Sequence, residues 1–147
     1  MLNQDYKEML STLLEEEVNF LLVGAYAMAA HGYPSATGDI DIFIQPNETN
    51  AEKVYSALIK FGAPLKNVSI EDFSTPGTIF QIGVAPRRIY IINSIDCVSF
   101  EDAYSDRIIV EIESIPVPVI SKENIIKNKE ATGRPKDKLD ADNLKNS

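Results

Sequence analysis

The chain has 147 residues and carries 22 acidic and 14 basic side chains, so its formal net charge is −8. An acidic balance of this size argues against broad, non-specific attraction to DNA or RNA, which requires a cationic surface. The single cysteine, Cys97, excludes an internal disulfide framework and favours the reducing cytoplasm. The first 17 residues mix acidic with apolar side chains, which indicates neither a signal peptide nor a membrane span.

The length fits one domain, predicted to span residues 1–147, and hydrophobic periodicity predicts its elements. Helices are predicted over residues 2–17, 25–31, 49–61, 100–105 and 121–129, with a last one that follows residues 133–135 and ends at 144. Strands are predicted over residues 19–23, 40–44, 78–82, 88–92, 108–112 and 115–120. Helices interleaved with strands, followed by antiparallel pairs, predict an α/β (α+β) fold in which helices cover mainly one face of a mixed sheet.

Two finer predictions concern the ends of elements. Thr49 or Asn50 is expected to cap the helix that ends at Phe61, because these side chains accept bonds from free N–H groups in a first turn. Pro116 and Pro118 indicate that the strand over residues 115–120 lies at an edge of the sheet, since proline cannot donate to a neighbouring strand.

Two aspartates in the second predicted strand carry the chemistry. Residues two apart in a strand project to the same face, so Asp39 and Asp41 point together while Ile40 points into the core. Two adjacent carboxylates repel each other unless a cation lies between them. Mg²⁺ accepts a few carboxylate oxygens together with water and phosphate oxygens. The pair therefore predicts a site for Mg²⁺ and a nucleotide, and the alternative is two solvated carboxylates on an exposed face.

A small-residue turn precedes this strand. The first predicted strand ends at Gly24, and Ala25 begins the helix that follows. Small residues at a strand–helix junction let a phosphate group approach the free N–H groups of the helix. The turn is common by itself, but a strand with two aspartates follows it closely in the chain.

Three blocks of sequence follow one another in a recognisable order. The first joins residues 31–34 (HGYP) to 37–41 (TGDID), the second runs from 78–83 (TIFQIG) to 94–96 (SID), and the third is 128–137 (NKEATGRPKD). Together they resemble the nucleotidyltransferase superfamily that includes polymerase-β-like enzymes. Within it they are most similar to the minimal, single-domain prokaryotic branch (MNT/AbiEii-like).

The resemblance implies a nucleotidyltransferase-like fold and Mg²⁺-dependent transfer of a nucleoside monophosphate from an NTP to a hydroxyl of an RNA or protein acceptor. It implies that Gly24 and Ala25 hold the phosphates and that Asp39 and Asp41 hold two Mg²⁺ ions. Members of this branch are often toxin or antitoxin components, which implies a cognate partner protein.

Two further residues are candidates for the nucleotide site. Arg88 or Lys129 is expected to balance phosphate charge, because a basic segment near a magnesium site suits a triphosphate. For Arg88, a solvated loop position is the alternative, and for Lys129, a charged helix face.

The chain departs from the pattern of the superfamily at three positions. A third carboxylate is expected where this sequence has Tyr90, and a phenol with an ordinary pKa of about 10 does not replace it as a metal ligand. Asp96, in the following loop, is the candidate replacement. Ser35 stands where arginine is common, and Ala25 where serine is found. Two hypotheses therefore stay open: an active nucleotidyltransferase, or a degenerate one that acts as a nucleotide-binding or partner-binding module.

Other polar residues have structural explanations. His31 is expected to cap the end of its helix, with contact to substrate as the alternative. Asp137 and Asp140 share one face of the last predicted helix, where ion pairs are favoured over metal ligation.

Overall fold

The computed structural model describes residues 2–33 and 38–146. Ser35 lies outside these residues. The helices are α1 (Gln4–Glu15), α2 (Gly24–Ala30), α3 (Glu48–Phe61), α4 (Phe100–Ser105), α5 (Lys122–Thr132) and α6 (Pro135–Lys145), with a short 3₁₀ helix η1 (Ile70–Ser74). The strands are β1 (Phe20–Val23), β2 (Ile40–Ile44), β3 (Ile79–Ile82), β4 (Ile89–Ile92), β5 (Ile108–Ile112) and β6 (Ile115–Val119). Every predicted helix and strand is confirmed, and only η1 was not predicted.

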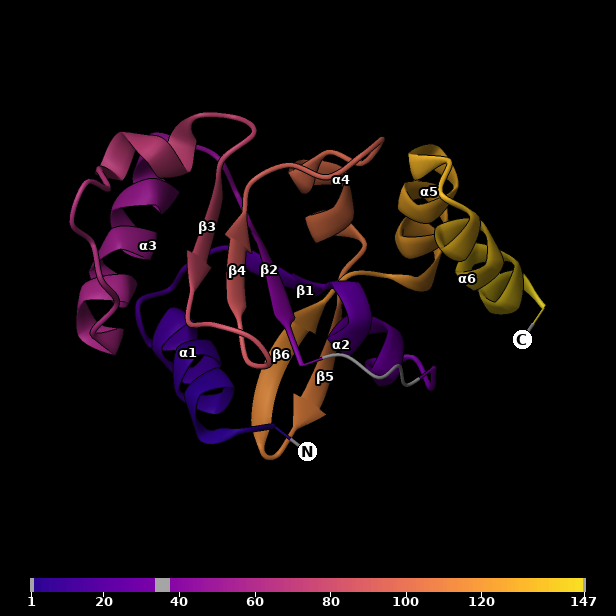
Figure 1. The fold of residues 1–147 in the computed structure, drawn as a ribbon, viewed down its shortest axis with the longest axis horizontal. Helices are drawn as coiled ribbons and strands as arrows, with labels where there is room; N and C mark the ends of the chain where they lie inside the picture. Colours follow the sequence, from indigo (N-terminus) through magenta and orange to yellow (C-terminus); the bar gives the residue numbers. More distant parts are fainter. Residues whose placement is uncertain (1, 34–37, 147) are drawn as a thin grey trace.

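The six strands form one mixed sheet in the order β3-β4-β2-β1-β6-β5 (Figure 1). Strand β2 runs antiparallel to β1 and parallel to β4, and β1 runs parallel to β6. The hairpins β3–β4 and β5–β6 are antiparallel. This arrangement confirms the predicted mixed sheet and places β2, which carries Asp41, at its centre.

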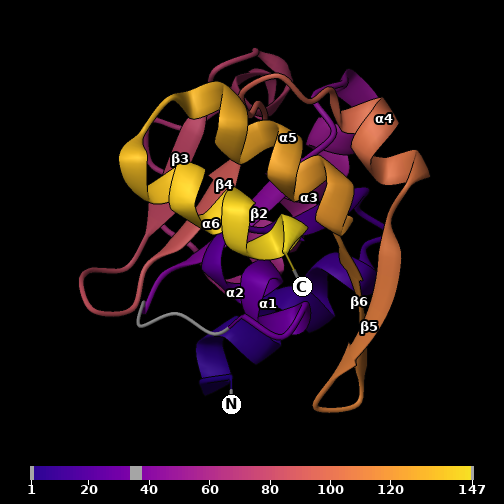
Figure 2. The ribbon, with the colours of Figure 1, turned by 90° about the vertical axis from the view of Figure 1, so that its right-hand side faces the viewer.

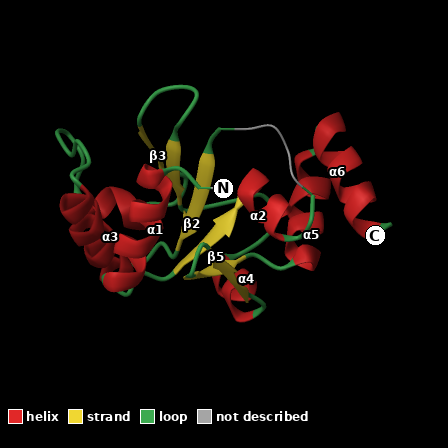
Figure 3. Ribbon diagram, turned by 90° about the horizontal axis from the view of Figure 1, so that it is seen from below, coloured by secondary structure: helices red, strands yellow, loops and turns green. Residues whose placement is uncertain are grey.

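Helices stand on both sides of this sheet, whereas the sequence prediction placed them mainly on one face. Helices α1 and α3 lie side by side on one side, and the α5–α6 hairpin stands on the opposite side, beyond α2 (Figures 2 and 3). The alternate residues Ile40, Ile42 and Ile44 of β2 are fully buried. Phe43 points to the other face, where its ring packs edge-on against Phe100 of α4 with centroids 5.1 Å apart. Among residues 2–33 and 38–146, no helix combines the length and the apolar character needed to span a bilayer.

The edge position predicted from Pro116 and Pro118 is wrong. Strand β6 lies between β1 and β5, and β5 is the edge strand. The N–H of Ile120 donates to the carbonyl of Leu22 in β1, so the backbone nitrogens of the alternate residues Pro116 and Pro118 also point toward β1. Only one residue pair, Leu22 with Val119, joins β1 and β6. The prolines are therefore tolerated because the pairing on their side of β6 is short.

The predicted cap of α3 is also wrong by a few residues. The N-cap is Asn47, whose side chain accepts a bond from the N–H of Asn50 at 2.8 Å. The Asn50 side chain is buried and bonds both the N–H and the carbonyl of Asn19 just before β1. A capping residue needs a free side-chain oxygen, but the oxygen of Asn50 already accepts the N–H of Asn19. The Asn50 amide therefore joins α3 to the start of β1 and does not cap the helix.

Asn93 fixes the loop region beyond β4. Its side chain is almost fully buried, and its oxygen accepts bonds from the N–H groups of Gly77 and Thr78, each at 3.0 Å. Its nitrogen donates to the carbonyls of Phe73 and Thr75 at 3.2 and 2.7 Å. One amide therefore holds η1 and the start of β3 against the end of β4.

Replacing Asn93 with alanine should lower the free energy of unfolding by about 2–4 kcal/mol, because four backbone groups lose a hydrogen bond to this buried side chain. Urea denaturation followed by circular dichroism measures this loss, with Ser94→Ala at the exposed neighbouring position as the control. A loss no larger than that of the control would contradict the bridging role of Asn93.

Candidate functional site

The turn between β1 and α2 lies directly beside the strand that carries Asp41. Val23, the last residue of β1, is the register partner of Asp41 in β2. Gly24 follows with φ of +70°, in the left-handed region that favours glycine. A Cβ atom at Gly24 would overlap the carboxylate of Asp41. The backbone of the turn and the Asp41 carboxylate can lie this close only because residue 24 is glycine.

The carboxyl group of Asp41 is held in an unfavourable electrostatic environment. Burial and, to a lesser extent, the negative charge of Asp39 raise its pKa to about 6, while the positive charge of Lys129 acts in the opposite direction. The Asp41 carboxylate is therefore only partly compensated by the positive charge of Lys129. A divalent cation between the two carboxylates would remove this cost.

Arg88, just before β4, and Tyr90, within β4, lie beside the Asp39–Asp41 pair. Nη1 of Arg88 is 3.9 Å from Oδ2 of Asp39, and it donates a hydrogen bond of 3.4 Å to the hydroxyl of Tyr90. Tyr90 is the register partner of Asp41 across the β2–β4 pairing. The structure thus brings the predicted residues Asp39, Asp41 and Arg88 together, and it places the Tyr90 side chain in the same group.

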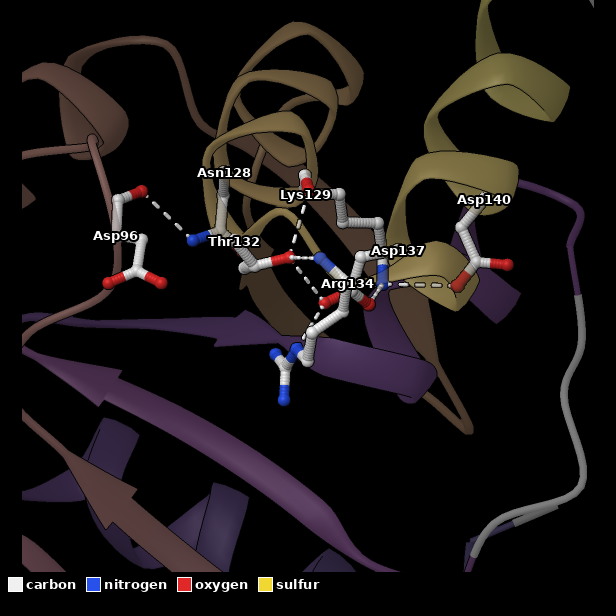
Figure 4. A network of polar contacts seen from close by, with 7 residues as sticks. All are labelled: Asp96, Asn128, Lys129, Thr132, Arg134, Asp137 and Asp140. Carbon is white, nitrogen blue, oxygen red and sulfur yellow. Dashed lines mark hydrogen bonds and ion pairs between the residues drawn. The ribbon is translucent and has the colours of Figure 1, made fainter.

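Asp96 does not join this group as a third metal ligand. Its side chain is exposed, and its backbone carbonyl accepts a bond of 3.0 Å from Nδ2 of Asn128 on α5 (Figure 4). Over the described ranges 2–33 and 38–146, no three His, Cys, Asp or Glu side chains lie close enough together to hold one metal ion. The loop after β4 therefore does not supply the third carboxylate that the resemblance leads one to expect at position 90.

A cavity of about 220 Å³ opens between the β1–α2 turn and the α5–α6 hairpin. Its polar lining combines Asp41 from the sheet with cationic and amide groups from the hairpin, and its apolar lining comes from strand ends and α5. The lining residues are Val23, Gly24, Asp41, Ile92, Ile95, Ile120, Ile125, Asn128, Lys129, Arg134 and Asp137. The cavity thus joins the first and third sequence blocks, which are distant in the chain.

Lys129 is the centre of a polar network on the hairpin (Figure 4). Its Nζ lies 3.3 Å from Oδ1 of Asp137 and 3.2 Å from Oδ2 of Asp140. Oδ2 of Asp137 also accepts bonds of 2.8 Å from Nε of Arg134 and from the hydroxyl of Thr132. The interpretation of Asp137 and Asp140 as ion-pair partners is confirmed.

Asp137 remains ionised although it is buried. Burial alone raises the pKa of its carboxyl group, but hydrogen bonds from Thr132 and Lys129, with the charges of Lys129 and Arg134, lower the pKa below its ordinary value. This carboxylate fixes the positions of two cations that line the cavity.

Gly24 and Ala25 face different spaces. Gly24 lines the cavity with Asp41, whereas Ala25 lines a second cavity of about 360 Å³. Tyr33 and Lys136 also line the second cavity, and Lys129 lines both. The first turn of α2 therefore directs Gly24 and Ala25 to different cavities, although the sequence resemblance assigned both to one phosphate site.

His31 and Tyr6 support the site from outside. His31 is the C-cap residue of α2, and its Nε2 lies 2.9 Å from the carbonyl of Ile120 after β6, so the ring joins two elements. The hydroxyl of Tyr6 donates to the carbonyls of Gly38 and Arg88 and holds together the backbones that precede Asp39 and Tyr90. Burial raises the pKa of Tyr6 to about 12, so this donor keeps its proton.

Sequence reasoning did not identify Asn128 or the apolar residues Ile120 and Ile125 as cavity lining. For Asn128, the signal was its place in the third sequence block. For the isoleucines no local signal exists, because an apolar residue at a strand end or in a helix normally indicates core.

The comparisons with known proteins agree on the fold. No family model and no curated protein sequence matches the chain. A candidate nucleotidyltransferase from Thermotoga maritima superimposes over 99% of this chain and 94% of its own, with a TM-score of 0.63 and 18% identity. The antibiotic-resistance factor ANT(2'')-Ia superimposes in its solution structure (TM-score 0.58, 12% identity) over 95% of this chain and 80% of the other. Its crystal complex with adenylyl-2''-tobramycin gives a TM-score of 0.58 and 13% identity over 95% and 84%. The chain therefore has a nucleotidyltransferase-like fold.

The raised pKa of Asp41 predicts a specific dependence of stability on pH. The folded state binds a proton at Asp41 more tightly than the unfolded state does, so this residue lowers stability as pH rises from about 4 to about 6. Without divalent cations, Asp41→Asn should be more stable than the wild type at pH 7 by roughly 1–2 kcal/mol after allowance for solvent screening. The difference in stability between Asp41→Asn and wild type should decrease below pH 6.

Urea denaturation in EDTA between pH 4.5 and pH 8 measures this gap. Glu52→Gln, an exposed position on α3, is the matched control and should show no such gap. A difference between Asp41→Asn and wild type that is independent of pH would contradict the electrostatic origin of the effect.

Proposed function

We propose that the chain binds an Mg²⁺–nucleoside triphosphate between the β1–α2 turn and the α5–α6 hairpin and transfers the nucleoside monophosphate to a hydroxyl of an RNA or protein acceptor. The observation that carries this proposal is the contact of Asp41 with Gly24 at one wall of a cavity whose other wall holds Lys129 and Arg134. The fold shared with nucleotidyltransferases supports the class of reaction.

The Asp39–Asp41 pair fits Mg²⁺ by its chemistry. This ion is often held by one or two carboxylates together with substrate phosphates, and Asp41 is a half-buried carboxylate whose charge is incompletely balanced. When bound, Mg²⁺ supplies charge neutralisation at the phosphates and at the leaving pyrophosphate. The resemblance implies two ions at this pair, and the stoichiometry of metal binding tests that number.

The protein's own groups bind and orient the nucleotide. The absence of a side chain at Gly24 lets a phosphate approach the backbone of the turn. Lys129 and Arg134 supply positive charge from the hairpin, and Asp137 keeps both in place. The apolar side chains of Ile92, Ile95 and Ile125 offer a surface for a base or ribose. Hydrogen bonds to phosphate are stronger in such a partly enclosed site than in water.

A second candidate function rests on one observation. Tyr90, not a carboxylate, is the register partner of Asp41, and Asp96 does not replace it. A nucleotidyltransferase without its third carboxylate loses a group that activates the attacking hydroxyl, which costs a factor of about 10²–10⁴ in rate. In this alternative the chain is a nucleotide-binding or partner-binding module of the toxin–antitoxin type.

Calorimetric titration with ATP, GTP, CTP and UTP tests the binding step. At least one nucleotide should bind in the presence of Mg²⁺, and Asp41→Asn should lose this binding because the pair of carboxylates is broken. Glu52→Gln is the matched control and should bind as wild type does. Absence of binding by every nucleotide would exclude the proposed enzyme and leave the partner-binding alternative.

A second experiment tests the role of position 90. Tyr90→Asp places a third carboxylate beside Asp41, so pyrophosphate release from the bound nucleotide, with water as acceptor, should rise by at least about tenfold. The control is Gln81→Asp, because Gln81 is the register partner of Tyr90 one strand further from Asp41. Intact binding without faster release in Tyr90→Asp would contradict the assignment of position 90 to the third carboxylate.

A further inference from the structure

Tyr90 does more than occupy the place of a missing carboxylate, because it brings a hydroxyl group to that place. It is the register partner of Asp41 in β2 and of Gln81 in β3, so all three side chains project from the same face of the sheet. Its side chain is half-buried, so part of it is open to solvent. A tyrosine side chain is longer than an aspartate side chain, and its hydroxyl therefore extends beyond the position that a carboxylate would fill.

The hydroxyl of Tyr90 is oriented by Arg88. Nη1 of Arg88 donates to this hydroxyl at 3.4 Å and lies 3.9 Å from Oδ2 of Asp39. One guanidinium nitrogen therefore separates the phenolic oxygen from a carboxylate of the proposed metal site. The hydroxyl of Tyr90 accepts the bond from Arg88, and within the described ranges 2–33 and 38–146 its own O–H has no acceptor. The hydroxyl is held by its oxygen and keeps its own proton available.

Two nearby tyrosines, Tyr6 and Tyr26, have different surroundings from Tyr90. The hydroxyl of Tyr6 is buried in the protein and donates to the backbone carbonyls of Gly38 and Arg88. Tyr26 packs edge-on against the ring of Tyr6, with centroids 5.7 Å apart, and is a residue of α2 outside the sheet. Tyr90 is therefore in register with Asp41, contacts Arg88 and is partly exposed.

We infer that Tyr90 is itself a nucleotide acceptor, so that the chain attaches a nucleoside monophosphate to its own tyrosine hydroxyl. This inference rests on the proposed function, because the bound NTP is the donor. In the reaction, Oη of Tyr90 attacks the α-phosphorus and an oxygen–phosphorus bond forms. The bond from the α-phosphorus to the bridging oxygen breaks, pyrophosphate leaves, and the phenolic proton passes to solvent. No oxidant or reductant is needed.

The residues around Tyr90 suit this step. The charge of Arg88 stabilises a phenolate oxygen as the proton leaves and can also face the attacked phosphate. Because Tyr90 and Asp41 are fixed on adjacent strands, little motion is needed to bring the hydroxyl to a nucleotide bound at Asp41. A product linked to Tyr90 would remain on the strand next to Asp41, which lines the cavity.

Intact-mass spectrometry and peptide mapping test the inference on the full chain. Mass is measured on the protein as purified and after incubation with Mg²⁺ and each of ATP, GTP, CTP and UTP. Incubation should add one nucleoside monophosphate, and mapping should locate it on Tyr90. Tyr90→Phe, which removes only the hydroxyl, should reduce incorporation to background. Tyr55→Phe is the matched control, because this hydroxyl bonds the carbonyl of Val68 from α3, and it should be modified as wild type is.

Calorimetry on the same samples separates this inference from the proposed function. If wild type binds an Mg²⁺–nucleotide but gains no mass, or gains it at another residue, Tyr90 is not an acceptor and the proposed binding site stands. If no nucleotide binds and no mass is gained, both proposals are wrong. Modification of Tyr90 that disappears in Asp41→Asn would support both.

Discussion

The register of β2 between its two neighbours is the constraint on which the site depends. Hydrogen bonding fixes Val23 of β1 opposite Asp41 and Tyr90 of β4 on its other side. A slip of one residue would turn Asp41 into the core and Ile42 toward the cavity, because side chains alternate between the two faces. The burial of Ile40, Ile42 and Ile44 on the opposite face prevents such a slip, since their exposure would cost several kcal/mol. The hydrophobic core thus determines where the carboxylate points.

The electrostatic state of the site follows from this placement. Asp41 is held partly out of water beside Asp39, and the nearest cations are already engaged: Arg88 with Asp39 and Tyr90, Lys129 with two carboxylates of α6. The hairpin therefore presents fixed positive charges near the fixed negative pair without neutralising it. Such an arrangement sacrifices some stability, and it suits the proposed Mg²⁺–nucleotide complex, which carries both charges.

The comparison structures and the site carry different information. At 12–18% identity the comparisons show that the chain shares its overall fold with these proteins. A fold of this kind supports several functions, and the side chains placed on it decide among them. Here the side chain that bears on function is the phenol of Tyr90, in register with Asp41. The resemblance leads one to expect a carboxylate at this position, and the phenol there makes a hydroxyl of the protein itself the proposed substrate.

The sequence by itself determined the helices and strands, the mixed sheet and the side-by-side aspartates, because these depend on local periodicity and on the alternation of side chains along a strand. It also indicated that position 90 matters. Only the tertiary structure decided that β6 is internal, that Gly24 and Ala25 face different cavities, and that Asp96 stays outside the site. It also decided that Lys129 is shared between Asp137 and Asp140. These facts depend on contacts between residues far apart in the chain, and no local pattern of residue types encodes the distance between such residues.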